Sequence, residues 1–596
     1  MLFESELKPL IVNVIKKNFD VAFTPEDIIL QETRKEFDGD ITLTVFNLAK
    51  KLGKNPAEFA EQLGSELVRD SLIDRYNVIK GFLNISIADA SVMDMFALKR
   101  SSGLCHIQNE STSHIMLEYS SPNTNKPIHL GHMRNNLLGY SVAEILKAAG
   151  HQVTKVNLIN DRGIHICKSM IAWLKFGKGE TPESTGTKGD HFVGQYYVAF
   201  DKAHKKEMAD LMDEGMSEDL AAKSTPILKE AQNLLTLWEK GDEETIRIWK
   251  MMNDWVYSGF DATYATMGVD FDKIYYESQT YLDGKEIVKR GLDQKVFFQK
   301  DDGSVWVDLS DEGLDQKLLL RSDGTSVYMT QDLGTALKRM EEYNPQQMIY
   351  VVGNEQDYHF KVLKLVMKKM GYSWWDSIYH LSYNMVDLPS GKMKSREGTV
   401  VDADDLIDEM IAEAAKASKE LGKVDDLNTD EALALNKIIA LGALKYFILR
   451  VDSDKRMLFN PNESIDLNGN TGPFIQYSHA RIKSVLRKAD QMGLSTTQTD
   501  LGAHTAAINE HERELILKLM QYEQTVIEAG RIYKPSIVAN YAYELSKTYN
   551  RFYQEQIIID ESNAAQTRFR VGLCVDCAHV ISKSMSLLGI EVPERM

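Results

Sequence analysis

The sequence predicts a multidomain α/β protein in which a parallel-sheet domain lies between a small α+β domain and an all-α bundle. Residues 1–110 alternate helical patterns with short apolar segments, and residues from about 114 follow the order strand, loop, helix, strand. From about residue 430 to the end the pattern is almost entirely helical. A chain of 596 residues, of which 43% are apolar, is long enough for about three to five separate cores.

Composition narrows the class of protein. The net charge of −18 argues against a protein that coats nucleic acid non-specifically, because phosphate binding depends on cationic surface. No apolar run approaches the roughly eighteen residues that span a bilayer, and residues 1–17 lack the basic start and continuous apolar stretch of a signal peptide. Four scattered cysteines suit a reducing compartment. We therefore expect a cytoplasmic protein without a membrane segment.

Cys574 and Cys577 form a CxxC pair, a spacing that occurs in zinc sites. No second CxxC or CxxH lies nearby in the sequence, and the flanking residues have a helical pattern. We interpret the pair as packing residues, since free cysteine behaves as a small apolar side chain. Neither a dedicated metal site nor a tightly bound cofactor is expected.

The parallel sheet is predicted from one strand–helix–strand unit. Residues 114–119 (HIMLEY) form a short apolar run, and residues 152–159 (QVTKVNLI) form a second. The helix between them ends at Gly150, a residue that is free to adopt positive φ. Such a unit predicts a Rossmann-like sheet with a nucleotide site at its carboxyl edge. The helix has these regularly spaced apolar positions: Leu130, Met133, Leu137, Val142, Ile145 and Ala149.

Other segments complete the outline. Residues 326–330 (SVYMT) and 347–352 (QMIYVV) are expected as further strands, and residues 180–260 as a charged helical insertion. The polar residues 101–113 are expected as a linker. We place the domain boundaries so that the three domains comprise residues 1–110, 111–455 and 456–596.

The strongest chemical signal is residues 121–132 (SPNTNKPIHLGH), in the loop between the first strand and its helix. At a helix N-terminus, His129 and His132 can donate hydrogen bonds toward phosphate oxygens, and the helix dipole adds to that attraction. Gly131 has no Cβ, which lets an adenine approach the backbone closely. Adenylation of a carboxylate by ATP needs positioning and charge stabilisation rather than a covalent nucleophile. The motif therefore points to adenylation chemistry.

The HLGH turn resembles the HIGH signature of class I aminoacyl-tRNA synthetases, and residues 121–127 before it resemble the arginyl-tRNA synthetase family. This resemblance implies activation of L-arginine with ATP and Mg²⁺, followed by transfer of arginine to the 3′-terminal adenosine of tRNA(Arg). It covers nearly the whole chain, because residues 1–110 are similar to the family's additional N-terminal domain, which contacts the tRNA elbow. From this resemblance we also expect the protein to be a monomer.

A second signature of this class is expected downstream. Residues 391–398 (GKMKSREG) resemble a KMSKS loop, which would bring lysine ammonium groups onto the β- and γ-phosphates of ATP. Ser395 stands where the general pattern has its second lysine, which leaves Lys394 or, by resemblance, Lys126 to replace it. The implied catalytic residues are Lys126, His129, His132, Lys392 and Lys394, and the implied ATP contacts are His129, Gly131, His132, Lys392 and Met393.

The chemistry of arginine indicates which residues its binding pocket needs. A guanidinium is a planar cation, so a specific pocket needs carboxylates placed for bidentate hydrogen bonds. Glu118 lies at the end of one expected strand, and Asp332 follows another. Asp332 could instead cap a helix that begins at Leu333. The resemblance implies these arginine-binding residues: Glu118, Asn123, His129, Tyr328, Asp332 and Gln356.

The C-terminal bundle resembles the family's anticodon-binding domain. Residues 466–481 resemble its opening, and residues 539–554 combine aromatic side chains with Lys547 and Arg551, which suits stacking on unpaired bases and contact with phosphate. Most of these aromatics are also spaced as one helix face, which is typical of core residues. The implied tRNA-binding residues are Gln476, Tyr477, Arg481, Tyr541 and Arg551.

Two alternatives remain at this point. One is another enzyme of the same superfamily, but small adenylyltransferases lack a long helical C-terminal domain, and a cysteine-specific synthetase needs zinc ligands that we do not find. The other is a non-catalytic, synthetase-like protein that uses its tRNA-binding surfaces for regulation. Such a protein has no reason to keep both signature histidines and Lys392.

Overall fold

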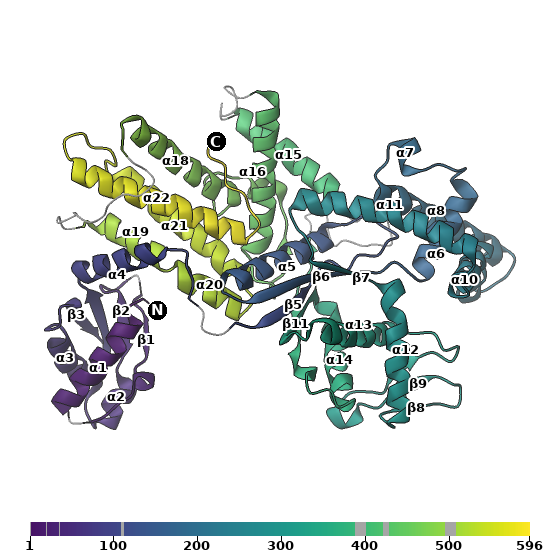
Figure 1. The fold of residues 1–596 in the computed structure, drawn as a ribbon, viewed down its shortest axis with the longest axis horizontal. Coiled ribbons are helices and arrows are strands. Elements are labelled where there is room, and N and C mark those ends of the chain that lie inside the picture. Colours follow the sequence, from purple (N-terminus) through teal and green to yellow (C-terminus); the bar gives the residue numbers. More distant parts are fainter. Residues whose placement is uncertain are drawn as a thin grey trace.

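A computed structural model describes residues 2–19, 21–34, 36–108, 112–387, 401–420, 428–494 and 508–596. A parallel sheet lies at the centre of the molecule (Figure 1). A small α+β part and a helical bundle lie on one side of this sheet, and a helical insertion lies on the other. The predicted multidomain α/β fold is therefore confirmed.

The N-terminal part is a four-stranded antiparallel sheet with helices packed on it, in the strand order β1-β2-β4-β3. Its last two strands form a hairpin, whose turn has positive φ at Lys80 (52°) and Gly81 (84°). The elements are α1 (Glu4–Phe19), β1 (Leu30–Glu32), β2 (Ile41–Thr44), α2 (Phe46–Lys51), α3 (Pro56–Leu67), β3 (Ile73–Ile79), β4 (Phe82–Ile87) and α4 (Asp89–Ser102).

The central sheet has five parallel strands in the order β12-β11-β5-β6-β7. Glu118, at the end of β5, pairs in register with Val156 of β6 and Tyr350 of β11, so the carboxyl ends of these strands meet at one edge. The elements of this part are β5 (His114–Glu118), α5 (Leu130–Ala148), β6 (Gln152–Ile159), β7 (Lys273–Tyr276), α12 (Glu277–Asp293), α13 (Tyr328–Tyr343), β11 (Gln347–Gly353), α14 (Asp357–Lys369), β12 (Ile378–Tyr383) and β13 (Val386–Asp387).

One predicted strand is wrong. Residues 326–330 do not form a strand, because α13 begins at Tyr328 with Val327 as its N-cap, and Ser326 makes only an isolated bridge to Leu320. An apolar run of this length does not distinguish a strand from the start of a helix. The helical spacing becomes visible only over the following turns, in the buried positions Met329, Leu333, Ala336 and Met340.

The predicted insertion is helical, as Figure 1 shows beside β7. Its two longest helices cross closely, because a Cβ at Gly259 would lie 2.3 Å from Asp190 Oδ1. A small antiparallel sheet follows later in the chain, in the order β10-β9-β8. These elements are α6 (Ile164–Phe176), α7 (Pro182–Thr185), α8 (Gly189–Asp213), α9 (Glu218–Ser224), α10 (Pro226–Glu239), α11 (Glu243–Met267), β8 (Phe297–Gln299), β9 (Val305–Val307) and β10 (Lys317–Leu320).

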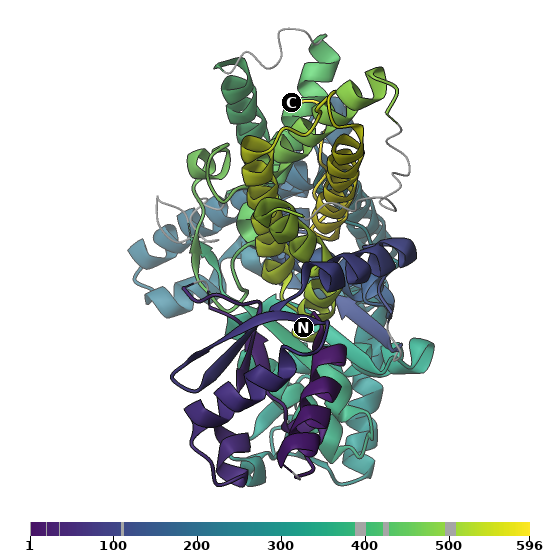
Figure 2. The same cartoon turned by 90° about the vertical axis from the view of Figure 1, so that its left-hand side faces the viewer.

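The C-terminal part is the predicted helical bundle, and Figure 2 shows it above the N-terminal part. Arg513 of α19 joins the two parts by donating to both carboxylate oxygens of Asp40, at 2.8 and 2.7 Å, and to the Ile87 carbonyl. The elements are α15 (Ala403–Glu420), α16 (Thr429–Leu449), β14 (Met457–Leu458), α17 (Pro461–Ser464), α18 (Gly472–Gln491), α19 (Glu510–Met520), α20 (Tyr522–Arg531), α21 (Pro535–Glu555) and α22 (Ala564–Leu587).

Helix α16 is apolar over a length that could cross a membrane, the single such helix among the residues described. Its most apolar window is 67% buried inside the protein. The core helix of a bundle has the same length and composition, so α16 is weak evidence for a membrane segment.

Helix α5 is held in place by a buried arginine. The Arg134 guanidinium donates to the carbonyl oxygens of Asn384 (2.6 Å) and Met385 (3.4 Å), which follow β12. It also donates to the carbonyls of Asp452, Ser453 and Lys455, at 3.1 to 3.4 Å, in the connection between α16 and β14. One side chain thus joins the first helix of the central sheet to segments far along the chain.

Candidate active site

The HLGH turn lies at the N-terminus of α5, at the carboxyl edge of the sheet. His129 is the extended N-cap residue of this helix, and its backbone N–H donates to His132 Nδ1 at 3.3 Å. The two imidazole rings stack with their centroids 3.8 Å apart. Because His132 Nδ1 accepts a hydrogen bond, its proton lies on Nε2 and is available for donation.

Both signature imidazoles are neutral at physiological pH. Burial and then the nearby Lys126 ammonium lower the pKa of His129 to about 4. Burial lowers the pKa of His132 well below its usual value, and burial also lowers the pKa of Lys126. The turn therefore combines two neutral hydrogen-bond donors with one partly buried cation, a set that suits phosphate oxygens.

The loop between β5 and α5 is fixed by polar contacts. Ser120 and Ser121 have positive φ (86° and 51°), a conformation that is costly for residues other than glycine. The Ser120 N–H donates to Asn135 Oδ1 at 2.6 Å, and the Ser121 N–H donates to Asn157 Oδ1 at 3.1 Å. Asn123 forms a bridge to Asn160, just after β6. These contacts hold the loop against α5 and the end of β6.

Glu118, a predicted arginine ligand, forms a buried ion pair with Arg339 of α13. The Arg339 guanidinium lies 4.9 Å from the ring centroid of Tyr275 and 5.4 Å from that of Tyr350. The carboxylate of Glu118 is thus neutralised within the protein. Any cation that binds beside Glu118 meets this pair rather than a free carboxylate.

Tyr328 and Asp332 lie four residues apart on the first turns of α13, so they share one helix face rather than the strand end that the sequence suggested. The Asp332 carboxylate lies 2.5 Å from His359 Nε2 of α14. Helix α13 begins at Tyr328, which excludes the reading of Asp332 as a cap for a helix beginning at Leu333. Its side chain is 30% exposed and is open to a ligand.

Glu277 is a functional candidate that the sequence did not single out. It is the first residue of α12, it is buried, and it accepts from Gln331 Nε2 at 2.5 Å. Burial raises its pKa to about 7, and the nearby carboxylates of Asp161 and Asp332 contribute in the same direction. The only sequence signal is its position directly after a strand, at the carboxyl edge.

The remaining predicted residues fall in different places. Gln356 lies in a short turn after β11, at the same sheet edge, and its side chain is exposed. Lys392, Met393 and Lys394 lie outside the described residues. A cavity of about 830 Å³ opens at the opposite, amino edge of the sheet, where Ser113, Gln347 and Ser377 line it, so it is remote from the HLGH turn.

Comparison with known proteins decides the family. The catalytic domain of the class I (R) tRNA synthetases matches residues 95–460, the arginyl-tRNA synthetase N-terminal domain matches residues 5–87, and the DALR anticodon-binding domain matches residues 475–596. The arginine–tRNA ligase of Bacteroides thetaiotaomicron is 53% identical over 601 residues, with 100% of each chain covered. The chain belongs to the arginyl-tRNA synthetase family.

Other relatives agree with membership of this family. The arginine–tRNA ligase of Flavobacterium psychrophilum is 52% identical over 610 residues and also covers 100% of each chain. Among solved structures, arginyl-tRNA synthetase from Thermus thermophilus has a TM-score of 0.78 at 23% identity, covering 100% of both chains, which shows the shared fold. The resemblance stated from the sequence is confirmed, and a synthetase for a different amino acid is ruled out.

In the anticodon-binding domain of this family member, the predicted tRNA-binding residues divide into buried and accessible side chains. Gln476 is buried and donates to the Ile438 and Glu591 carbonyls, at 3.0 and 2.8 Å. Tyr541 is also buried and donates to the Lys518 carbonyl at 2.9 Å. These two side chains pack the bundle and present no surface to RNA.

The other three predicted residues are partly or fully accessible. The Arg481 guanidinium lies 4.9 Å from the ring centroid of Tyr477 and 5.4 Å from that of Tyr553, which is 40% exposed. Arg551 is exposed and pairs with Glu514 at 2.9 Å. Arg481, Tyr477 and Tyr553 thus form an arginine–tyrosine group across α18 and α21, of which the sequence had singled out two members.

Proposed function

We propose that this protein is an arginine–tRNA ligase, which activates L-arginine with ATP to arginyl-adenylate and pyrophosphate and then transfers arginine to the 3′-terminal adenosine of tRNA(Arg). The observation that carries the proposal is the full-length identity of 53% to an arginine–tRNA ligase. Neutral histidines at a helix N-terminus, on the carboxyl edge of a parallel sheet, support adenylation at this position. A non-catalytic protein would not need that arrangement.

For adenylation, we assign the phosphate-binding role to Lys126, His129 and His132. The arginine carboxylate attacks the α-phosphorus of ATP, the bond from that phosphorus to the bridging oxygen breaks, and pyrophosphate leaves with the electron pair. His132 Nε2–H and the Lys126 ammonium can stabilise the negative charge that develops on the phosphate oxygens. ATP, as its magnesium complex, is a co-substrate, and Lys392, Met393 and Lys394 remain proposed contacts.

Gly131 leaves room beside the signature imidazole. A Cβ at this position would lie 3.1 Å from both Nδ1 and Cε1 of His129, so any larger residue would displace that ring. We therefore propose that Gly131 preserves the His129 position as well as access of the nucleotide to the backbone.

For arginine, we propose a guanidinium end built on α12 and α13. Asp332 and Glu277 supply negative charge there, and Tyr328 lies on the same helix face as Asp332. The Asp332 carboxylate contributes to the raised pKa of Glu277, and a bound guanidinium would relieve that repulsion. The α-amino and α-carboxylate groups are assigned to the predicted residues Asn123, His129 and Gln356, and Glu118 remains a proposed arginine contact.

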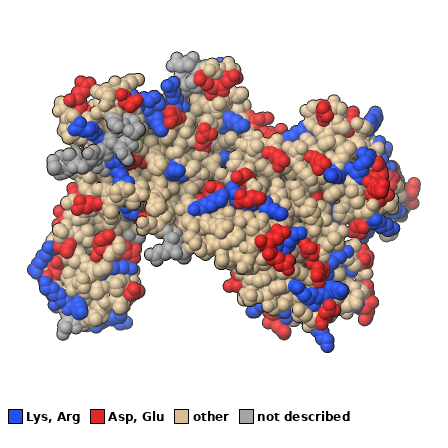
Figure 3. All heavy atoms as spheres, in the orientation of Figure 1, with Lys and Arg blue, Asp and Glu red and all other residues tan. Residues whose placement is uncertain are grey.

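For tRNA, we propose contacts by the N-terminal domain and by the arginine–tyrosine group. Residues 1–110, 111–455 and 456–596 are the proposed domains for the tRNA elbow, catalysis and the anticodon. Figure 3 shows acidic and basic side chains interspersed over the visible face, so RNA contact rests on local groups such as Tyr477, Arg481, Tyr553 and Arg551. A monomeric cytoplasmic enzyme completes the proposal.

Arginine-dependent exchange of pyrophosphate into ATP tests the function directly. The purified full-length chain is incubated with ATP, labelled pyrophosphate, arginine and tRNA(Arg), and lysine and citrulline replace arginine as matched controls. We expect exchange with arginine, and aminoacylation of tRNA(Arg), at rates well above those with either control. Exchange that is absent or indifferent to the amino acid would reject the proposal.

A further inference from the structure

The insertion helix α8 lies directly on the loop that carries Lys126. A Cβ at Gly194 of α8 would lie 3.0 Å from Pro127 Cδ and 3.7 Å from Lys126 Cα. Glycine at this position therefore permits the close approach, since a Cβ would push on the residues that precede the HLGH turn. The sequence had suggested only that residues 180–260 form an insertion.

A backbone segment supports the same turn. The Leu130 N–H donates to the Val401 carbonyl at 3.1 Å, and the Ala403 N–H donates to the Ile128 carbonyl at 2.9 Å. His129 and Asp402 face each other in an antiparallel bridge between these bonds. Residues 401–403 thus hold the HLGH turn as a neighbouring strand would, and α15 begins at Ala403, the last of them.

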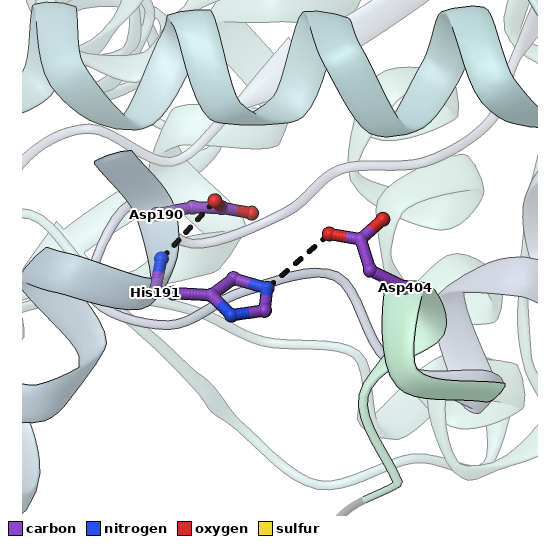
Figure 4. Close-up of side chains that lie close together, drawn as sticks. All are labelled: Asp190, His191 and Asp404. Atoms are coloured by element: carbon purple, nitrogen blue, oxygen red, sulfur yellow. Dashed lines mark hydrogen bonds and ion pairs between the residues drawn. The ribbon is translucent and has the colours of Figure 1, made fainter. Parts of the chain in front are cut away.

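Five charged side chains join α8 to this segment, and we call them the clasp: Lys188, Asp190, His191, Asp402 and Asp404. The Lys188 ammonium lies 2.5 Å from Asp404 and 3.1 Å from Asp190. His191 Nε2 lies 3.2 Å from Asp402 and 3.2 Å from Asp404, and Figure 4 shows the ring pointing from α8 toward the start of α15.

The clasp is strongly ionic. Hydrogen bonds to Asp402 and then to Asp404 raise the pKa of His191 to about 10. Burial alone would raise the pKa of Asp404, but contacts with His191 and Lys188 lower it to about 2. Thr263 of α11 adds a hydrogen bond to Asp404 at 3.0 Å, so a third helix joins the group.

A metal ion is not needed to hold these carboxylates together. Ligand atoms of Asp190, His191 and Asp404 lie within 4.8 Å of one another, a spacing that could hold a cation. The Lys188 ammonium already contacts both aspartates of that trio, and Asp404 is also paired with His191. The protein thus supplies its own positive charge, and the group connects helices rather than presenting free ligands.

We propose that the clasp positions the HLGH turn for adenylate formation, with Asp404 as its central positioning residue. Asp404 contacts two cations of the clasp, and the backbone groups of Val401 and Ala403, three residues and one residue before it, are hydrogen-bonded to the turn. Loss of its charge weakens the link between α8 and residues 401–403, and the signature histidines then lose their orientation toward phosphate. This inference rests on the proposed function, because it concerns the same reaction.

The test compares Asp404→Asn with Asp405→Asn. Asp405 is the next residue in the first turn of α15 and its side chain is exposed, so the control removes an equivalent charge from the same helix N-terminus. In arginine-dependent pyrophosphate exchange with tRNA(Arg), we expect Asp404→Asn to lower kcat about tenfold while the KM for arginine changes less than twofold. Asp405→Asn should change neither constant more than twofold.

The outcomes separate the inference from the proposed function. A wild-type protein that shows no arginine-dependent exchange contradicts the proposed function. If the wild-type protein shows exchange but Asp404→Asn and Asp405→Asn have equal kcat, the positioning role is overturned. An effect of Asp404→Asn on KM alone overturns it as well.

A second pair of variants covers a failure of Asp404→Asn to fold, which circular dichroism would reveal. Lys188→Arg keeps the cation that faces Asp404, whereas Lys188→Met removes it at similar length. We expect Lys188→Met to lower kcat about tenfold and Lys188→Arg to stay within threefold of the wild type. Equal kcat in these two variants would overturn the inference.

Discussion

Two groups of histidines meet at the same turn in opposite charge states. His129 and His132 stack on each other beside Lys126, and burial lowers the pKa of both. His191 faces two carboxylates, which raise its pKa to about 10. One of them belongs to Asp402, the residue that bridges His129. Burial therefore keeps His129 and His132 neutral, whereas neighbouring carboxylates keep His191 cationic, although all three are the same residue type.

The neutral and cationic charge states of these histidines suit two different roles. A neutral imidazole donates to phosphate without repelling the Lys126 ammonium, whereas a cationic imidazole attracts the aspartates that join α8 to α15. A second histidine–aspartate pair, His359 with Asp332, lies at the proposed guanidinium end. In our proposals, the same pair of residue types therefore serves positioning in one place and substrate binding in another.

The largest expected effect comes from removing a neutral donor. His129→Ala should lower kcat for arginine-dependent exchange about a hundredfold, which is about 3 kcal/mol and the scale for losing one transition-state donor. His106→Ala, at an exposed histidine, is the control and should retain wild-type kcat. A wild-type rate in His129→Ala would show that the turn takes no part in the reaction.

The second effect distinguishes the two histidine–aspartate pairs. Asp332→Asn should raise the KM for arginine about thirtyfold, since a hydrogen bond to a charged group contributes about 2 kcal/mol. The kcat should change less than threefold, which is the reverse of the pattern expected for Asp404→Asn. Steady-state exchange kinetics at varied arginine measure both constants. An unchanged KM, with unchanged discrimination against citrulline, would remove Asp332 from the pocket.

The third effect concerns pH. Glu277 has a pKa of about 7 in the free enzyme, so it is protonated below pH 7 and loses the charge that attracts a guanidinium. We expect kcat/KM for arginine to fall up to about tenfold between pH 7 and pH 6, with no inflection in kcat near pH 6.5, because His129 stays neutral down to about pH 4. Glu277→Gln should abolish the fall, and its persistence in that variant would exclude Glu277 as the cause.

The smallest expected effect is on stability. The folded-state pKa of His129, about 4, is below the unfolded value of about 6.5, so the unfolded chain binds the extra proton first as pH falls. The wild type should lose about 1 kcal/mol relative to His129→Gln between pH 7 and pH 5.5 in urea unfolding. His191 behaves oppositely: its contribution is present below pH 6.5 and is lost as pH rises through about 10. Parallel pH dependence in His129→Gln and His191→Gln would contradict the comparison.

Local patterns predicted the centre of this molecule well. The strands at residues 114–119 and 152–159 and the helix between them occur as expected, and Gly150 ends the helix with a φ of 91°. Each of these features depends on residues close in sequence. The HLGH turn belongs to the same unit, so the proposed phosphate end of the site could be located from the sequence.

Features that depend on distant residues were not predictable. Lys188 and Asp404 are far apart along the chain, and nothing in either local pattern links them. Tyr541 lies on a helix face that suits either RNA or a core, and only the packing of the neighbouring helices shows that it is buried. Burial raises the pKa of Glu277, with further contributions from Asp161 and Asp332, and this environment is built by residues far apart along the chain.

Arg134 has a consequence for synthesis of the chain on the ribosome. Its carbonyl acceptors begin at Asn384 and end at Lys455, so they are translated long after α5 itself. At 5 to 20 residues per second, roughly 15 to 60 s pass before the last acceptors emerge. During that interval the guanidinium has no native partner and must stay hydrated, so α5 cannot take its final buried place while the chain is nascent. The nucleotide-binding half of this enzyme therefore completes its packing only when the ribosome has reached the bundle.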